Sequence, residues 1–222
     1  MRQISRLSVI AVSTALLITL SSCSSTQSTL EADDQPSTPT ENRETVTSGQ
    51  ISDVPENNND SGESPQGSVT DAANFEIAEN EDGTVTISRY IGTETDIVIP
   101  SQIGGKTVSA IGNVTGTTGA FEGCTSITAV VIPDGVTEIQ DNAFYDCTSL
   151  ETVTIPSSVT LLRNCAFCDC PNLRAVYFKG DAPQQSNYVF DSTENVTMYY
   201  QDGTSGWENP WHGRPAEVYI PE

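Results

Sequence analysis

The side chains of this chain that could do chemistry are six cysteines and one histidine. Cys165 and Cys168 form a CxxC motif, which in redox proteins opens a helix of a thioredoxin-like unit. A zinc site would need thiolate ligands alone, because His212 is the only imidazole. The remaining internal cysteines recur every 23 residues: Cys124, Cys147 and Cys170. Their regular spacing indicates buried positions in a repeat, and we interpret Cys165 and Cys168 as turn residues.

Catalytic motifs are missing around His212. The chain has no Gly-x-Ser-x-Gly nucleophile elbow, and no Ser-His-Asp set can be assembled from it. Residues 104–107 (GGKT) resemble the end of a phosphate-binding loop, but Pro100 stands where the first glycine must be. We therefore predict that the protein is not an enzyme and holds no metal ion or cofactor.

The cysteine spacing is part of a longer repeat. Phenylalanines recur with the same period of 23 residues: Phe121, Phe144, Phe167 and Phe190. The units 132–154 and 155–177 both begin with Ile-Pro and both contain an Ala-Phe pair, followed by Leu and Val at matching positions. A period in the twenties is typical of a solenoid, in which each unit buries its apolar face against the next unit.

The elements of this solenoid follow from residue alternation. Short strands are expected before each Ile-Pro, and a short helical or 3₁₀ turn is expected at each Ala-Phe pair on the convex side. Residues 75–91 alternate apolar and polar side chains around Asp82-Gly83, which predicts an N-terminal β-hairpin cap. Trp207, Trp211 and a strand at 216–220 are expected to close the other end. The extra residues of the first unit, 102–106 and 113–119, are expected to be surface loops.

One strand face offers a candidate ligand-binding surface. At a period of 23, its outward row contains Val98, Val131, Thr154, Tyr177 and Tyr200. Beside that row lie Ala129, Thr152, Ala175 and Met198, with Arg174 alongside. Tyr and Arg often anchor interfaces, although exposed strands favour Tyr and Thr in any case. The candidate binding residues are Thr152, Thr154, Arg174, Tyr177, Met198 and Tyr200.

The N-terminus carries an export signal. Arg2 and Arg6 precede a run of apolar residues that is too short to cross a bilayer easily, as is typical of a signal peptide. The sequence Leu-Ser-Ser-Cys that ends at Cys23 resembles the bacterial lipobox. We expect residues 1–22 to be cleaved and Cys23 to be lipidated. The alternative is an ordinary cleavage site with an incidental cysteine.

Acidic residues dominate the next segment and the chain as a whole. Residues 23–74 are rich in Ser, Thr, Asn and Pro, and carry many carboxylates but one base, Arg43. Such a segment buries too little apolar surface to fold, so we predict a disordered tether. With a formal net charge of −21, the chain lacks the clustered bases that nucleic-acid binding needs.

The repeat unit, Ile-Pro-x-x-Val-Thr…Ala-Phe-x-x-Cys-x-x-Leu-x-x-Val, resembles the BspA-type bacterial leucine-rich repeat. The resemblance covers residues 97–200 and implies a β-rich leucine-rich-repeat solenoid, here spanning residues 75–222 (cap 75–96, repeats 97–200, C-terminal cap 201–222). It implies a lipid-anchored protein on the extracellular side of the cell membrane or outer envelope. Such a protein would bind a protein of a host or neighbouring cell, for example in adhesion. Two alternatives are a structural or envelope-assembly protein with a partner in the same cell, and a glycan-binding accessory module.

Overall fold

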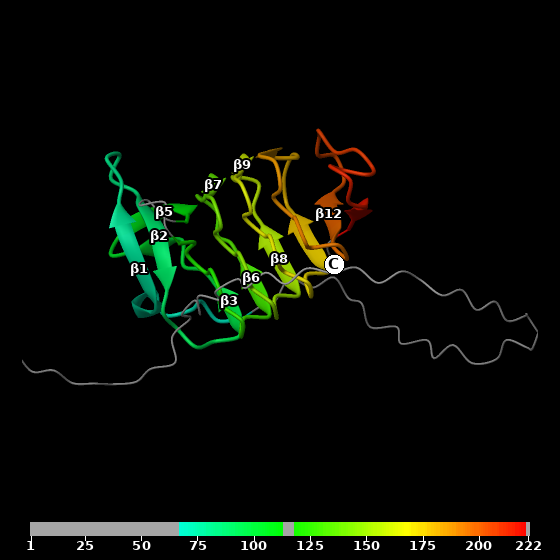
Figure 1. Ribbon diagram of the computed structural model, residues 1–222. Coiled ribbons are helices and arrows are strands. Elements are labelled where there is room, and N and C mark those ends of the chain that lie inside the picture. The colour runs from blue at the N-terminus through cyan, green and yellow to red at the C-terminus, as the bar shows by residue number, and fades with distance from the viewer. Residues whose placement is uncertain (1–66, 113–117, 221–222) are drawn as a thin grey trace, which may run out of the picture.

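A computed structural model describes residues 67–112 and 118–220, which build two sheets along one axis. Figure 1 shows the strands side by side, from the N-terminal hairpin in green to the C-terminal strands in orange and red. Sheet A contains β1 (Phe75–Glu79), β2 (Val85–Tyr90), β4 (Gln102–Ile103), β5 (Lys106–Ile111), β7 (Glu138–Ile139), β9 (Leu161–Leu162) and β11 (Gln184–Gln185). Sheet B contains β3 (Asp96–Val98), β6 (Ala129–Val131), β8 (Thr152–Ile155), β10 (Ala175–Phe178), β12 (Thr197–Gln201) and β13 (Ala216–Tyr219).

Each repeat gives one strand to each sheet. In the unit that begins at Ile155, β9 joins sheet A and β10 joins sheet B, and both pair in parallel with the strands of the preceding unit. Val153 lies opposite Val176 across one such pair. Parallel strands one repeat apart are what a constant period imposes, because equivalent residues must lie beside each other. The predicted leucine-rich-repeat solenoid is confirmed.

The recurring phenylalanines form a stacked column through the core. Phe144 lies 4.7 Å from Phe121 and 5.1 Å from Phe167, measured between ring centroids, and both pairs are nearly coplanar. Phe190 ends the column 5.4 Å from Phe167, and Tyr90 of β2 begins it 5.2 Å from Phe121. All five rings are buried. The column ties every unit, and the N-terminal hairpin, to one continuous core.

The segments around the Ala-Phe pairs differ from the prediction. They are runs of turns, and the single helix of the described residues is the 3₁₀ helix η1 (Ala72–Asn74). Asn142 and Asp146 flank one such turn with φ of 56° each, and Cys165 and Asp169 flank the next with 51° and 54°. Two left-handed residues per turn interrupt a helical hydrogen-bond pattern, and Asn and Asp tolerate that conformation better than most residues.

The folded part begins before the predicted boundary at Phe75. Thr70 is buried, its N–H donates to the carbonyl of Val98 at 2.9 Å, and η1 follows it. The sequence of residues 67–74 has few apolar residues, so this docking rests on backbone bonds that composition does not reveal. After it, β1 and β2 form the predicted antiparallel hairpin. No helix in the described residues is long and apolar enough to cross a membrane.

Aromatic side chains close the C-terminal end. The ring of Trp207 stacks on Tyr200 at 5.0 Å, and Trp211 packs edge-on against Phe178 at 5.7 Å. The predicted last strand is present as β13, which pairs in parallel with β12. Sheet B therefore continues for two strands past β10, whereas sheet A ends at β11 in the same unit.

Candidate protein-binding surface

The outer face of sheet B is built by strand alternation. Every second side chain of a strand points away from the core. The inward row is buried and consists of Val130, Val153, Val176 and Met198. The outward row runs in register across five strands and consists of Val98, Val131, Thr154, Tyr177 and Tyr199. This face is the longest continuous strand surface of sheet B, and it becomes aromatic toward the C-terminus.

Two predicted members of this face are misplaced by one residue. Tyr177 pairs with Tyr199, and Met198 pairs with the core residue Val176. The prediction that Met198 and Tyr200 point outward is therefore wrong: Met198 is fully buried, and Tyr200 lies on the core side against Trp207. The reason is that this step of the strand register is 22 residues, and a shift of one residue exchanges the two faces of a strand.

Three tyrosines on this face contact one another, and we call them the tyrosine cluster: Tyr177, Tyr199 and Tyr219. The rings of Tyr177 and Tyr199 stack with centroids 5.2 Å apart, and Tyr219 meets Tyr177 edge-on at 5.4 Å. All three are half-buried. Burial raises the pKa of the Tyr219 phenol, because the charged form loses solvation. The cluster is thus a rigid aromatic surface with neutral hydroxyls at physiological pH.

The remaining predicted binding residues surround this cluster unevenly. Arg174 is exposed beside β10, and its backbone N–H donates to the carbonyl of Glu151 at 2.9 Å. Thr152 is half-buried on the outward side, whereas Thr154 is only 2% exposed. Arg174 and Tyr177 are therefore available at the surface, and Thr154 is not. Sequence reasoning missed Tyr199 and Tyr219.

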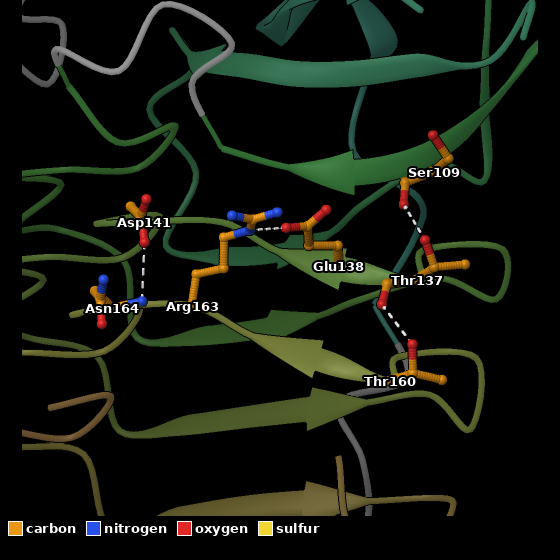
Figure 2. Close-up of polar contacts among 7 residues, drawn as sticks. All are labelled: Ser109, Thr137, Glu138, Asp141, Thr160, Arg163 and Asn164. Atoms are coloured by element: carbon orange, nitrogen blue, oxygen red, sulfur yellow. Dashed lines mark hydrogen bonds and ion pairs between the residues drawn. The ribbon is translucent and has the colours of Figure 1, made fainter. Parts of the chain in front are cut away.

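The outer side of sheet A carries polar contacts between units instead of aromatic side chains. Figure 2 shows the hydroxyl of Thr160 donating to the carbonyl of Thr137, and the hydroxyl of Thr137 donating to that of Ser109. In the same view the Arg163 guanidinium pairs with the carboxylate of Glu138, one unit earlier. These groups satisfy one another and fix the register of neighbouring units.

The cysteines occupy structural positions. Cys147 and Cys170 are free, buried thiols, and Cys124 is buried too. Cys165 and Cys168 form a disulfide within a turn, and no helix begins there. In the part of the chain that the structure describes, no three His, Cys, Asp or Glu side chains gather in a way that could hold a metal ion. Cys23 lies outside the described residues, as does most of the insert at 113–119.

Comparisons with known proteins agree with this architecture. Residues 106–205 match the BspA type leucine rich repeat region in six copies. A leucine rich repeat protein from T. pallidum is 22% identical with a TM-score of 0.50, over 70% of this chain and 84% of that chain. A leucine rich cell surface protein from Faecalibacterium prausnitzii is 30% identical with a TM-score of 0.50, over 72% of this chain and 44% of that chain. No curated protein matches the sequence.

Proposed function

Because residues 106–205 are a BspA-type leucine-rich repeat region, we propose that this protein binds another protein through the outer face of sheet B. We further propose that a lipid anchor at Cys23 holds it at the cell surface. The tyrosine cluster is the observation that carries the proposal. Tyrosine buries a large area with few rotatable bonds, and Arg174 beside it supplies a charged group of the kind that anchors interfaces.

The ring geometry favours a protein over a glycan. A sugar stacks on open ring faces, but Tyr177 and Tyr199 turn their faces to each other at 5.2 Å. What they offer to a ligand is ring edges and hydroxyl groups, which suit the mixed apolar and polar surface of a protein. The notion of a glycan-binding module therefore has less support than protein binding.

The surface location rests on two separate observations. The first is the signal-like sequence that ends at Cys23. The second is the structural similarity to a Faecalibacterium protein described as a leucine rich cell surface protein. A partner on a host cell and a partner in the envelope of the same cell are both compatible with this location, and binding experiments separate them.

The test uses the full chain and two sets of probes, namely purified extracellular-matrix proteins and an envelope extract of the source cell. Once a protein is retained and identified, it is titrated against three variants. A Tyr177→Ala/Tyr199→Ala double variant should weaken binding by about 2 kcal/mol or more, the usual effect at anchor residues. Deletion of residues 113–119 and the substitution Thr160→Ala on sheet A should leave the affinity nearly unchanged.

The opposite pattern would place the binding site elsewhere. If the loop deletion or Thr160→Ala abolishes binding while the double tyrosine variant binds normally, the outer face of sheet B is not the site. Retention of a matrix protein alone indicates host adhesion, and retention of an envelope protein alone indicates assembly within the cell.

A further inference from the structure

We propose that the outer edge of β13 captures an extended segment of a partner polypeptide. The segment would add a strand to sheet B and place a basic side chain beside Glu217. This inference deepens the proposed function, since it assumes a protein partner and adds a second, backbone-directed contact to the tyrosine cluster. It rests on the unpaired edge, the exposed apolar side chains and the charge of this end of the solenoid.

Backbone groups of β13 point away from the sheet at its outer edge. The carbonyl of Pro215 accepts from the N–H of Met198 at 2.9 Å, so the backbone of residue 215 faces β12. Because alternate residues of a strand face opposite edges, Ala216 and Val218 face outward. The Asn209 side chain accepts from the N–H of Ala216 at 3.3 Å. Among the described residues, no group bonds to the N–H or carbonyl of Val218 in this way.

The opposite edge of sheet B is covered. Val98 of β3 is the equivalent outward-facing residue there, and both of its backbone groups are paired. Its carbonyl accepts from the N–H of Thr70 at 2.9 Å, and its N–H donates to the Thr70 hydroxyl at 3.1 Å. Proteins usually protect a sheet edge in some such manner, because an open edge pairs readily with another strand. Within the described residues, β13 lacks that protection.

The side chains of β13 suit strand addition as well. Val218 is 49% exposed and Ile220 is 84% exposed, and both project on the core side of the strand. Val218 lies beside Tyr200 in the register and ends an inward row that is apolar in every earlier strand. An added strand would cover Val218 with an apolar residue of its own, as each repeat covers the one before it.

Charge selects the kind of segment. The described residues contain 20 Asp and Glu against 6 Lys and Arg, a net charge of −14. Glu217 is exposed on the outward side of β13, beside Tyr199 in the register. Like charges across a strand pair destabilise it and opposite charges stabilise it. A basic segment therefore fits, whereas a second copy of this acidic chain would bring two strongly negative surfaces together.

The expected occupant has a defined pattern. Apolar side chains should alternate with Lys or Arg, so that one set covers Val218 and the other set lies next to Glu217. Main-chain hydrogen bonds to Val218 would supply affinity in this binding mode, and the alternating side chains would supply specificity.

The test measures fluorescence polarisation of two labelled peptides with the full chain. In one peptide valine alternates with lysine and threonine, and in the other glutamate replaces every lysine. The basic peptide should bind and the acidic peptide should not. Val218→Pro should weaken binding by about tenfold or more, because proline removes the outward N–H without removing a bond to β12. Glu217→Lys should reverse the preference between the two peptides.

Controls keep the outcome interpretable. Melting temperatures should be alike for the wild type and Val218→Pro, and Tyr177→Ala/Tyr199→Ala should bind the basic peptide normally. Equal binding of both peptides, no binding of the basic peptide, or normal binding by Val218→Pro overturns the proposal. Self-association of the wild-type chain that Val218→Pro abolishes also overturns it, because the occupant is then a second copy. None of these outcomes bears on the tyrosine cluster, which the partner titration tests separately.

Discussion

At the scale of single residues, the buried cysteine position acts as a hydrogen-bond donor between units. The Cys147 thiol donates to the carbonyl of Phe121 at 3.1 Å, and the Cys170 thiol donates to that of Phe144 at 3.1 Å. In the last unit Thr193 takes this position, and its hydroxyl donates to the carbonyl of Phe167 at 2.8 Å. The position thus selects a small side chain that satisfies a buried carbonyl, and thiol chemistry is not required.

The environment of Cys147 predicts a loss of stability at alkaline pH. Burial raises the pKa of this thiol well above its ordinary value of 9.0. Since the folded pKa is raised, the stabilisation is complete below the unfolded pKa and is lost as the pH rises through it. At pH 10 the loss from this thiol should be about 1.4 kcal/mol.

Urea denaturation at pH 8 and pH 10 checks this expectation, with Cys147→Thr as the control. Threonine keeps the donor, as Thr193 shows, but does not titrate. The variant should therefore lose less stability than the wild type between the two pH values. An equal loss in both proteins would mean that another group causes the alkaline destabilisation.

At the scale of elements, the phenylalanine column predicts unequal costs for equivalent substitutions. Phe144 and Phe167 each stack on two neighbouring rings and are fully buried. Phe190 stacks on one ring and is 6% exposed. Phe144→Ala and Phe167→Ala should each lower the free energy of unfolding by about 3–5 kcal/mol, and Phe190→Ala by less. Chemical denaturation measures all three, and small, equal changes would show that the column does not carry the core.

The repeat made most of these elements predictable, and its one irregularity made the binding face partly wrong. Strands, core phenylalanines and both caps follow from a period of 23, which holds as far as Val196 opposite Leu173. The next step, from Ala175 to Thr197, is 22 residues. The apolar side chain of Met198 was the available signal, because it belongs with Val176 in the inward row.

Other features had no such signal. The left-handed residues that replace the expected helical turns depend on backbone conformation, which the Ala-Phe pattern does not specify. Docking of Thr70 on β3 depends on two backbone groups of Val98. The contact between Tyr219 and Tyr177 crosses an intervening strand, so repeat spacing could not reveal it.

At the scale of the whole molecule, the proposed attachment depends on Cys23. Cys23→Ala should abolish incorporation of a fatty-acid analogue during growth, and the protein should be released or remain unprocessed. A single acyl chain binds membranes only weakly, so stable attachment requires the two chains that a lipobox cysteine receives. Metabolic labelling followed by fractionation measures both effects, with Cys147→Thr as a control that keeps the label. Unchanged labelling of the Cys23 variant would refute the lipid anchor.

The stacking of strands along one axis also determines how the molecule responds to tension. The described chain enters beside β3 at one end, through Thr70, and leaves after β13 at the other. A pull between a tether at the first end and a partner held at the second runs parallel to the hydrogen bonds between strands. Such a load peels strands apart one after another, whereas a load along the strands would shear all bonds at once. The solenoid would therefore lengthen under flow in unit steps, each releasing 23 residues or about 80 Å of chain.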